Sequence, residues 1–287
     1  MKPYVFRDTK AILGESLVWD AANSAMLWCD ITAGQLHSSR LDGAVDGSTD
    51  ATLRLPAPLA SFALAADGFV VSLEDRVVVI DRTGAVLQTL ATIEHGRPGL
   101  RLNEGKADPA GRWVTGSMIL VGDEPVGAYY SVTEAGARVL YGGLGVANGL
   151  EWSLDGSRVF FTDTSVAAIY TGDYTAAGDI ENVEVWHSGT PNDGLAIDEQ
   201  GCFWSALYGD GAVVRYDEAG NEIARVQMPA PNVTSVAFGG PNLATLYVAT
   251  ARENLTEEQL EQHPLSGASF AIETETRGLP PRTFARR

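Results

Sequence analysis

Oxygen-bearing side chains recur at one position of a repeated segment of this chain. Glu15, Asn148 and Asp193 each lead a short apolar run that ends in a turn, and Asn103 leads a less regular copy. Carboxylate and amide oxygens are the ligands that hard divalent cations such as Ca²⁺, Mg²⁺ and Mn²⁺ prefer. The sequence therefore predicts an oxygen-rich site, provided that the fold brings these distant positions together.

The spacing of the segments indicates how they meet. Their leading positions are residues 15, 60, 103, 148, 193 and 234, which lie 45, 43, 45, 45 and 41 residues apart. A repeat of about 40–50 residues with four short strands is typical of a β-propeller blade. Equivalent positions of successive blades form a ring around a central channel, and this ring would consist of Glu, Ala, Asn, Asn, Asp and Thr. We expect the function at that end of the channel.

Each repeat shows the same internal order of elements. A short apolar run leads to a turn containing Asp or Gly, and a second run rich in β-branched and aromatic residues follows, as in residues 159–163 and 202–206. Short strands at regular spacing, separated by turn residues, predict an all-β fold. The six repeats between about residue 15 and residue 280 predict a six-bladed β-propeller, with residues 1–287 as a single domain.

Two segments outside the regular pattern also have predicted structures. An open stack of blades would leave an unpaired strand edge, so residues 4–6 are expected to form the outer strand that closes the last blade. The last repeat carries an insertion over residues 252–263. There, the sequence that begins at Thr256 predicts one short helix with an N-cap.

The candidate site residues have simpler explanations as well. Asn148-Gly149 and Asp193-Gly194 are dipeptides typical of tight turns, so a purely structural role is an alternative for both. Glu15 is not a turn residue, and its presence at the same repeat position favours a common site.

A second group of candidate residues lies at the start of the third repeat. Arg101 and Asn103 alternate along an extended segment, which puts their side chains on one side of it. An Arg beside a cation site can hold the carbonyl or hydroxyl oxygens of a substrate by hydrogen bonds. The alternative is an Arg in a surface loop.

Composition argues against several other classes of protein. A phosphate-binding face needs clustered Lys and Arg, so the net charge of −17 argues against a nucleic-acid partner. No apolar stretch approaches the ~18 residues of a membrane span, and the first residues lack a signal-peptide core. A cytoplasmic protein with no membrane association and no obligatory protein partner is expected. Cys29 and Cys202 lie in apolar runs and are expected to be buried free thiols.

Other catalytic and metal-binding patterns are missing from the sequence. The four histidines have no metal-ligand spacing, which argues against a zinc site, and no Gly-x-Ser-x-Gly motif of a serine hydrolase occurs. The acidic segment over residues 42–50 lacks the glycine and the terminal Glu of an EF-hand loop, and it is expected to be a solvated turn.

Several motifs taken together resemble the SMP-30/gluconolactonase/regucalcin family. They are Leu13-Gly-Glu15 followed by Val18-Trp19, the stretch over residues 101–112, Ala147-Asn-Gly-Leu150, Pro191-Asn-Asp-Gly194 and Ala249-Thr-Ala-Arg252. The resemblance covers nearly the whole chain and implies a six-bladed propeller. It also implies that Glu15, Asn148 and Asp193 bind one divalent metal ion. By the same resemblance, Arg101 and Asn103 contact the substrate.

The resemblance further implies hydrolysis of a sugar lactone to the aldonic acid. The cation would act as a Lewis acid, and Asp193 would act as general base towards the attacking water. Ca²⁺ is the expected ion, with Zn²⁺, Mn²⁺, Mg²⁺ and Fe²⁺ as alternatives. A related metal-dependent ester hydrolase, a calcium-binding regulator without catalysis and a protein-interaction platform stay open as alternatives.

Three positions depart from the family pattern. Ser16-Leu17 stands where the family often has Gly-Pro, and Glu104 stands where it often has Asp. Some members also place an acidic substrate contact just after the residue equivalent to Met118, whereas the next acid here is Asp123. These differences bear on the choice of lactone more than on the chemistry.

Overall fold

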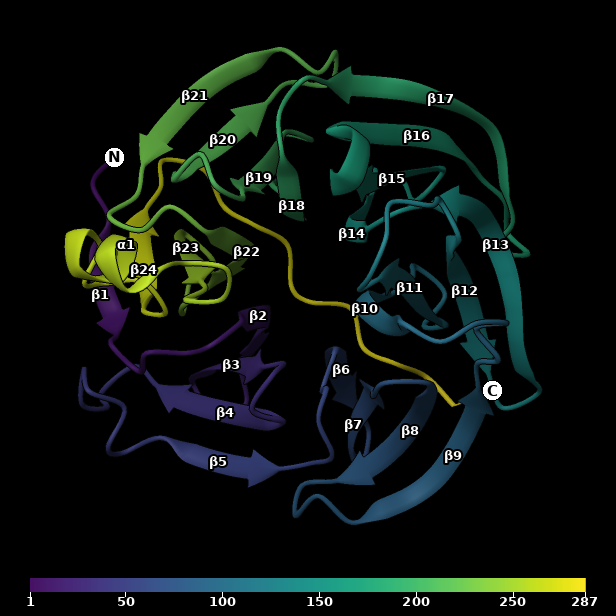
Figure 1. Ribbon diagram of the computed structural model, residues 1–287, viewed down its shortest axis with the longest axis horizontal. Coiled ribbons are helices and arrows are strands. Elements are labelled where there is room, and N and C mark those ends of the chain that lie inside the picture. The colour runs from purple at the N-terminus through teal and green to yellow at the C-terminus, as the bar shows by residue number, and fades with distance from the viewer. Residues whose placement is uncertain (287) are drawn as a thin grey trace.

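The computed structural model describes residues 1–286, which form an almost entirely β-stranded molecule. Its 24 strands make six four-stranded sheets, all antiparallel within the sheet and arranged around one axis (Figure 1). The predicted all-β, six-bladed β-propeller is therefore confirmed.

The blades follow one another along the chain, and each runs from an inner to an outer strand. Blade 1 comprises β2 (Gly14–Asp20), β3 (Ala25–Asp30), β4 (Gln35–Arg40) and β5 (Ala51–Arg54). Blade 2 comprises β6 (Ser61–Ala65), β7 (Gly68–Ser72), β8 (Arg76–Asp81) and β9 (Val86–Thr92). Blade 3 comprises β10 (Leu100–Ala107), β11 (Trp113–Ile119), β12 (Gly127–Thr133) and β13 (Gly136–Leu144).

The second half of the ring repeats this order until the chain closes on itself. Blade 4 comprises β14 (Ala147–Trp152), β15 (Arg158–Asp163), β16 (Ala168–Tyr174) and β17 (Ile180–Ser188). Blade 5 comprises β18 (Asn192–Ile197), β19 (Phe203–Leu207), β20 (Ala212–Tyr216) and β21 (Glu222–Gln227). Blade 6 comprises β22 (Val233–Gly239), β23 (Thr245–Thr250), β24 (Ser269–Glu273) and, as its outer strand, β1 (Tyr4–Arg7).

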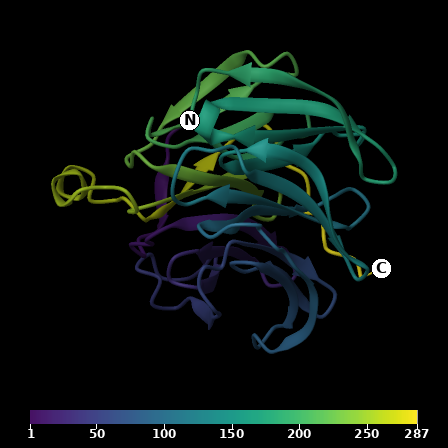
Figure 2. The ribbon, with the colours of Figure 1, turned by 45° about the vertical axis from the view of Figure 1, so that its right-hand side comes forward.

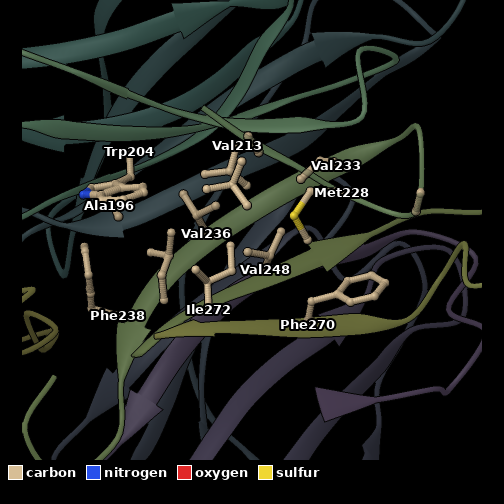
Figure 3. Packing of buried hydrophobic residues seen from close by; sticks show 14 of the residues in the cluster. Ala196, Trp204, Val213, Met228, Val233, Val236, Phe238, Val248, Phe270 and Ile272 are labelled. Atoms are coloured by element: carbon tan, nitrogen blue, oxygen red, sulfur yellow. The ribbon is translucent and has the colours of Figure 1, made fainter. Parts of the chain in front are cut away.

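Neighbouring blades pack face to face through apolar side chains. Between blades 5 and 6, Trp204 meets Phe238 edge-on with ring centroids 6.1 Å apart, and Val236 and Ile272 lie in the same buried cluster (Figure 3). Full burial of one such side chain stabilises the fold by about 1.5–3 kcal/mol. Similar clusters lie between the other blades. They hold the inner strands β2, β6, β10, β14, β18 and β22 around the channel.

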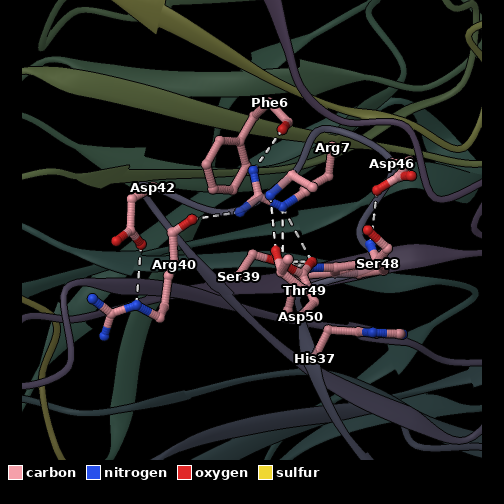
Figure 4. Close-up of polar contacts among 12 residues, drawn as sticks. Phe6, Arg7, His37, Ser39, Arg40, Asp42, Asp46, Ser48, Thr49 and Asp50 are labelled. Carbon is pink, nitrogen blue, oxygen red and sulfur yellow. Dashed lines mark hydrogen bonds and ion pairs between the residues drawn. The ribbon is translucent and has the colours of Figure 1, made fainter.

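A buried ion pair ties the closing strand β1 to blade 1 (Figure 4). The Arg7 guanidinium donates from Nε to both carboxylate oxygens of Asp50, at 3.0 and 3.2 Å, and from Nη1 to the Phe6 carbonyl at 2.8 Å. Its Nη2 donates to the Arg40 carbonyl, and the Ser39 hydroxyl donates to Asp50. The first and last blades are therefore joined by side chains as well as by the pairing of β1 with β24.

The expectation that residues 42–50 form a solvated turn is wrong at one end of the segment. The Asp50 side chain is only 2% exposed, because it is the acceptor for Arg7. Asp42 and Asp46 remain at the surface as expected.

The chain after β24 crosses the face of the ring, from blade 6 towards blades 2 and 3 (Figure 1). Gly278 forms a β-bridge with Asp198, and Phe284 forms one with Ala65 and is buried. Between these anchors, Arg282 donates to the Glu151 carboxylate at 2.6 Å. This C-terminal tail, residues 274–286, therefore lies across the end of the channel where the inner strands finish.

The predicted helix is present in the insertion of the last blade. α1 (Glu257–Gln262) begins after the N-cap Thr256, whose hydroxyl accepts from the Gln259 amide while the Gln259 side chain accepts from the Thr256 amide. The helix projects from the edge of the propeller (Figure 2).

Two further expectations concern cysteines and membrane segments. Cys29 and Cys202 are buried free thiols, as expected. No helix within residues 1–286 has the length and apolar character needed to cross a bilayer.

Candidate metal and substrate site

The predicted ring residues lie near the starts of the inner strands. Glu15, Asn148 and Asp193 are the second residues of β2, β14 and β18, and Asn103 lies in β10. All four therefore lie at the same end of the channel, opposite the end that the C-terminal tail crosses.

Each inner strand that carries a polar ring residue contains a β-bulge. Five inner strands contain a register shift at this level: β2, β10, β14, β18 and β22. The exception is β6, which pairs regularly with β7 and whose leading residue is Ala60. A bulge inserts an extra residue and re-aims side chains out of the normal alternation. The irregular backbone thus coincides with the strands that present polar groups to the axis.

The two Xaa-Gly dipeptides of the ring lie inside strands, so the turn interpretation of Asn148-Gly149 and Asp193-Gly194 is wrong. Their glycines instead permit close contact between neighbouring inner strands. A Cβ at Gly149 would lie 2.2 Å from the Asp193 carbonyl oxygen, and one at Gly194 would lie 2.9 Å from the Cα of Ser235. Glycine is needed because a side chain would push the ligand-bearing strands apart.

A chain of hydrogen bonds fixes the amide side chains of the ring. Arg101 donates from Nη1 to Asn103 Oδ1 at 2.6 Å, and Asn103 donates from Nδ2 to Asn148 Oδ1 at 2.6 Å. Asn148 Nδ2 donates to the Thr164 hydroxyl at 2.8 Å, and Thr164 donates to the Asn192 carbonyl at 2.7 Å. The Arg101–Asn103 contact confirms that the two side chains share one side of β10. These bonds leave Asn148 Oδ1 with a second lone pair for another partner.

The pKa values of the two ring carboxylates, Glu15 and Asp193, are strongly raised. Burial raises the pKa of Glu15 to about 8, and the nearby Glu104 charge adds to the rise, although the Ser16 amide donates to Glu15 at 3.1 Å. Burial also raises the pKa of Asp193 well above its usual range, with the charges of Glu15 and Glu104 acting in the same direction. Arg101 opposes both shifts but is the weakest of the effects. Two carboxylates placed so close to each other in a buried site call for additional positive charge.

A divalent cation fits this set of donors. Glu15 and Asp193 offer carboxylate oxygens, Asn148 offers an amide oxygen, and all three are hard ligands. Among residues 1–286, no group of three or more His, Cys, Asp and Glu side chains is arranged to hold a metal. A cation here would therefore need a donor besides the two carboxylates, and the Asn148 amide oxygen is one that can supply it.

A pocket of about 460 Å³ opens beside Arg101 on the site face of the ring. Its lining is mainly apolar and includes Pro58 and Met118, and its polar residues include Glu253 and Asn254. Arg101 is buried and has only its Nη1 engaged by described acceptors, Asn103 and its neighbouring carbonyl. Its remaining donors are available to a ligand in the pocket.

A smaller cavity of about 120 Å³ lies deeper in the channel, between the ring and the C-terminal tail. Glu104, Lys106, Glu151 and Arg282 are among its lining residues. Lys106 donates to Glu151 at 3.0 Å and to the Leu195 carbonyl at 2.8 Å, and Arg282 donates to the other oxygen of Glu151. The Glu151 carboxylate therefore has two cationic partners. Among residues 1–286, the Glu104 carboxylate accepts a hydrogen bond only from the Gly105 amide, at 2.8 Å.

The sequence did not point to three residues that contact the site. Thr164 accepts a hydrogen bond from Asn148, the Tyr129 hydroxyl donates to the Asn148 carbonyl, and Glu253 lines the pocket beside Arg101. Thr164 directly follows β15 and lies outside the repeated leading position. Tyr129 and Glu253 lie outside the repeated position, so the period carried no information about them.

Comparison with known proteins connects this geometry with a family of enzymes. The family described as SMP-30/gluconolactonase/LRE-like region matches residues 13–252. The 6-deoxy-6-sulfogluconolactonase of Pseudomonas putida is 36% identical, with 96% of both chains covered. The L-arabinolactonase of Azospirillum brasilense is 32% identical, with 97% of this chain and 94% of the relative covered.

A solved structure extends the similarity to the whole fold. The calcium-binding protein regucalcin from Agrobacterium tumefaciens strain C58 superposes with a TM-score of 0.89 at 28% identity, covering 98% of this chain and 96% of that one. The matched region contains every ring residue described above. This chain belongs to the SMP-30/gluconolactonase/LRE-like family.

Proposed function

We propose that this protein hydrolyses a sugar lactone to the corresponding aldonic acid with the help of one divalent cation. The observation that supports the proposal is that Glu15, Asn148 and Asp193 lie at the same end of the channel as Arg101, which lines a pocket of about 460 Å³. The two relatives named as lactonases, which align over nearly their full length, support the reaction class.

Glu15, Asn148 and Asp193 would hold the cation, because they supply oxygen donors at equivalent positions of three inner strands. When bound, such a cation supplies positive charge that polarises the lactone carbonyl and stabilises the oxyanion of the tetrahedral intermediate. Ca²⁺ is the favoured ion, since the regucalcin that superposes on this chain is described as calcium-binding.

Asp193 is the proposed general base. The attacking water forms a bond to the carbonyl carbon while its proton passes to the Asp193 carboxylate. The bond between that carbon and the ring oxygen then breaks, and the proton moves from Asp193 to the ring oxygen as the new hydroxyl forms.

Arg101 and Asn103 are proposed to bind the lactone. Arg101 retains free donors that face the pocket, and a guanidinium matches carbonyl and hydroxyl oxygens well. Asn103 fixes Arg101 on one side and Asn148 on the other, so substrate and ligand groups share one framework.

The test is a pH-indicator assay of acid release over a panel of aldonolactones, with EDTA and with metal added back. The proposal requires that at least one lactone is hydrolysed, that EDTA removes the activity, and that a divalent cation restores it. Full activity after exhaustive chelation would contradict the metal-dependent mechanism. Tight Ca²⁺ binding without turnover of any lactone would instead favour a calcium-binding regulator.

A further inference from the structure

The pocket beside Arg101 has an acidic wall that the repeat pattern does not account for. Glu253 and Asn254 follow β23 at the start of the insertion that carries α1, and both line the pocket with Arg101. No other Asp or Glu lines this pocket among the described residues. Glu253 is therefore its one acidic group.

The backbone of Glu253 is fixed at the pocket mouth. Its amide donates to the Ile12 carbonyl at 2.9 Å, and its carbonyl accepts from Asn232 Nδ2 at 2.8 Å. The next residue, Asn254, has a left-handed φ of +63° and donates from Nδ2 to the Tyr208 hydroxyl at 3.0 Å. These bonds hold the backbone of Glu253 in place, although the residue lies at the start of a projecting loop.

Glu253 and Arg101 line the same pocket without forming an ion pair. Within residues 1–286, neither side chain has an ion-pair partner at 4.0 Å or less, and the Glu253 carboxylate accepts no hydrogen bond. Burial lowers the pKa of Arg101, and Glu253 is the carboxylate that opposes this shift most strongly. The two charges thus act on each other without direct contact, and both side chains line the same pocket of about 460 Å³.

In this pocket, Arg101 offers hydrogen-bond donors, whereas the Glu253 carboxylate only accepts hydrogen bonds. A carboxylate accepts hydrogen bonds from sugar hydroxyls, and it repels an anionic substituent placed at the same point. A polyhydroxylated lactone held by Arg101 at its carbonyl end would carry its remaining hydroxyls towards this wall.

We propose that Glu253 is a specificity-determining residue that selects neutral, polyhydroxylated lactones and disfavours lactones with a carboxylate or sulfonate group. The inference rests on the proposed lactonase function and adds the substrate class. It also supplies an acidic substrate contact from blade 6, in a chain where Ile119–Val121 provide none after Met118.

A matched pair of substrates tests the proposal. D-Glucono-1,4-lactone and D-glucaro-1,4-lactone differ only in a terminal CH₂OH or carboxylate, so their kcat/KM ratio reports the charge preference. For Glu253→Gln, we expect kcat/KM for the neutral lactone to fall about 10-fold, mainly through KM, because a hydrogen bond to a charged group is lost. The value for the anionic lactone should rise by a similar factor.

Two further variants provide the control and a stronger perturbation. Glu261→Gln makes the same charge change on the exposed helix α1, away from the pocket, and should leave the ratio unchanged. Glu253→Lys should shift the ratio further towards the anionic lactone, and this gain should shrink as NaCl is raised. A purely structural role for Glu253 would lower both rates together.

The outcomes separate this inference from the proposed function. Suppose that the wild-type protein hydrolyses lactones, and that both Glu253→Gln and Glu253→Lys keep the wild-type ratio of kcat/KM between the neutral and the anionic lactone. The selectivity role is then wrong, and the lactonase function stands. If the wild-type protein hydrolyses no lactone, the proposed function is wrong and the specificity role falls with it. A shift confined to the two Glu253 variants supports the assignment.

Discussion

Asn103 donates its side-chain amide to Asn148 Oδ1 at 2.6 Å and so joins β10 to β14 at the level of the ring. The same Asn103 accepts from Arg101 through its Oδ1. One small side chain thereby fixes both a proposed substrate-binding group and a proposed metal ligand.

Replacing this bridge should weaken the site without unfolding the protein. For Asn103→Ala, we expect a loss of about 10- to 100-fold in metal affinity or in kcat/KM, which is typical for groups that orient a ligand. Calcium titration and lactone hydrolysis measure the two effects. Unchanged values for both would show that Arg101 and Asn148 keep their positions without Asn103.

Loss of the general base should affect turnover most. Asp193→Asn keeps the shape of the side chain but cannot accept the proton of water, so kcat should fall by about 10²–10⁴-fold. Asp210→Asn changes the same charge at an exposed position and serves as the control. Near-normal turnover of a metal-loaded Asp193 variant would show that another group takes the proton.

The buried carboxylates should make the stability of the metal-free protein depend on pH. The pKa of Glu15 is raised in the folded state, so its contribution is fully present below the ordinary pKa of Glu and is lost as pH rises towards about 8. The melting temperature of the EDTA-treated protein should therefore fall between pH 5 and pH 8. Ca²⁺ should raise the melting temperature more at pH 8 than at pH 5, because protons compete less for the carboxylates at pH 8.

A variant at Glu15 provides the control for this pH effect. Glu15→Gln removes the titrating group and should flatten the decrease in melting temperature over the same range. An identical pH profile in the two proteins would assign the effect to other groups.

The ion pair between blades 6 and 1 should matter strongly for stability. Arg7→Ala leaves Asp50 buried without its cation, which costs about 3–5 kcal/mol in comparable sites. Urea unfolding followed by fluorescence measures the free energy of unfolding. Arg40→Ala removes an exposed Arg that pairs with Asp42 and should change this free energy little.

Close packing of the inner strands can be tested at one glycine. Gly149→Ala should destabilise the fold and disturb the site, since its Cβ would lie 2.2 Å from the Asp193 carbonyl. Gly142→Ala in β13 is the control, because its Cβ would meet only Ala128, at 4.0 Å. Equal melting temperatures for the two variants would mean that the strands can separate without cost.

The fold was predictable because the same pattern of strands and turns recurs at a nearly constant interval in the sequence. The leading residues Glu15, Asn103, Asn148 and Asp193 keep their spacing, and this spacing predicted both the blades and the end of the channel where the residues lie. The helix α1 was predictable for a local reason, since its N-cap and first turn are contiguous in sequence.

Contacts between distant, non-repeated residues were not predictable in the same way. Arg7 and Asp50 pair only after the ring has closed. The sequence alone therefore predicts a solvated Asp50, although its side chain is buried. Gly149 and Gly194 have the sequence of turn residues, and only the neighbouring strand shows why glycine is required. Glu253 lies on an insertion, where no period applies.

The C-terminal tail makes the two ends of the channel different. Residues Leu279, Pro280, Pro281 and Arg282 form the floor of the deeper cavity, and Phe284 is wedged into blade 2 beyond it. The tail thereby covers the end of the channel opposite Arg101. A lactone and the aldonate formed from it would therefore enter and leave on the side of Arg101.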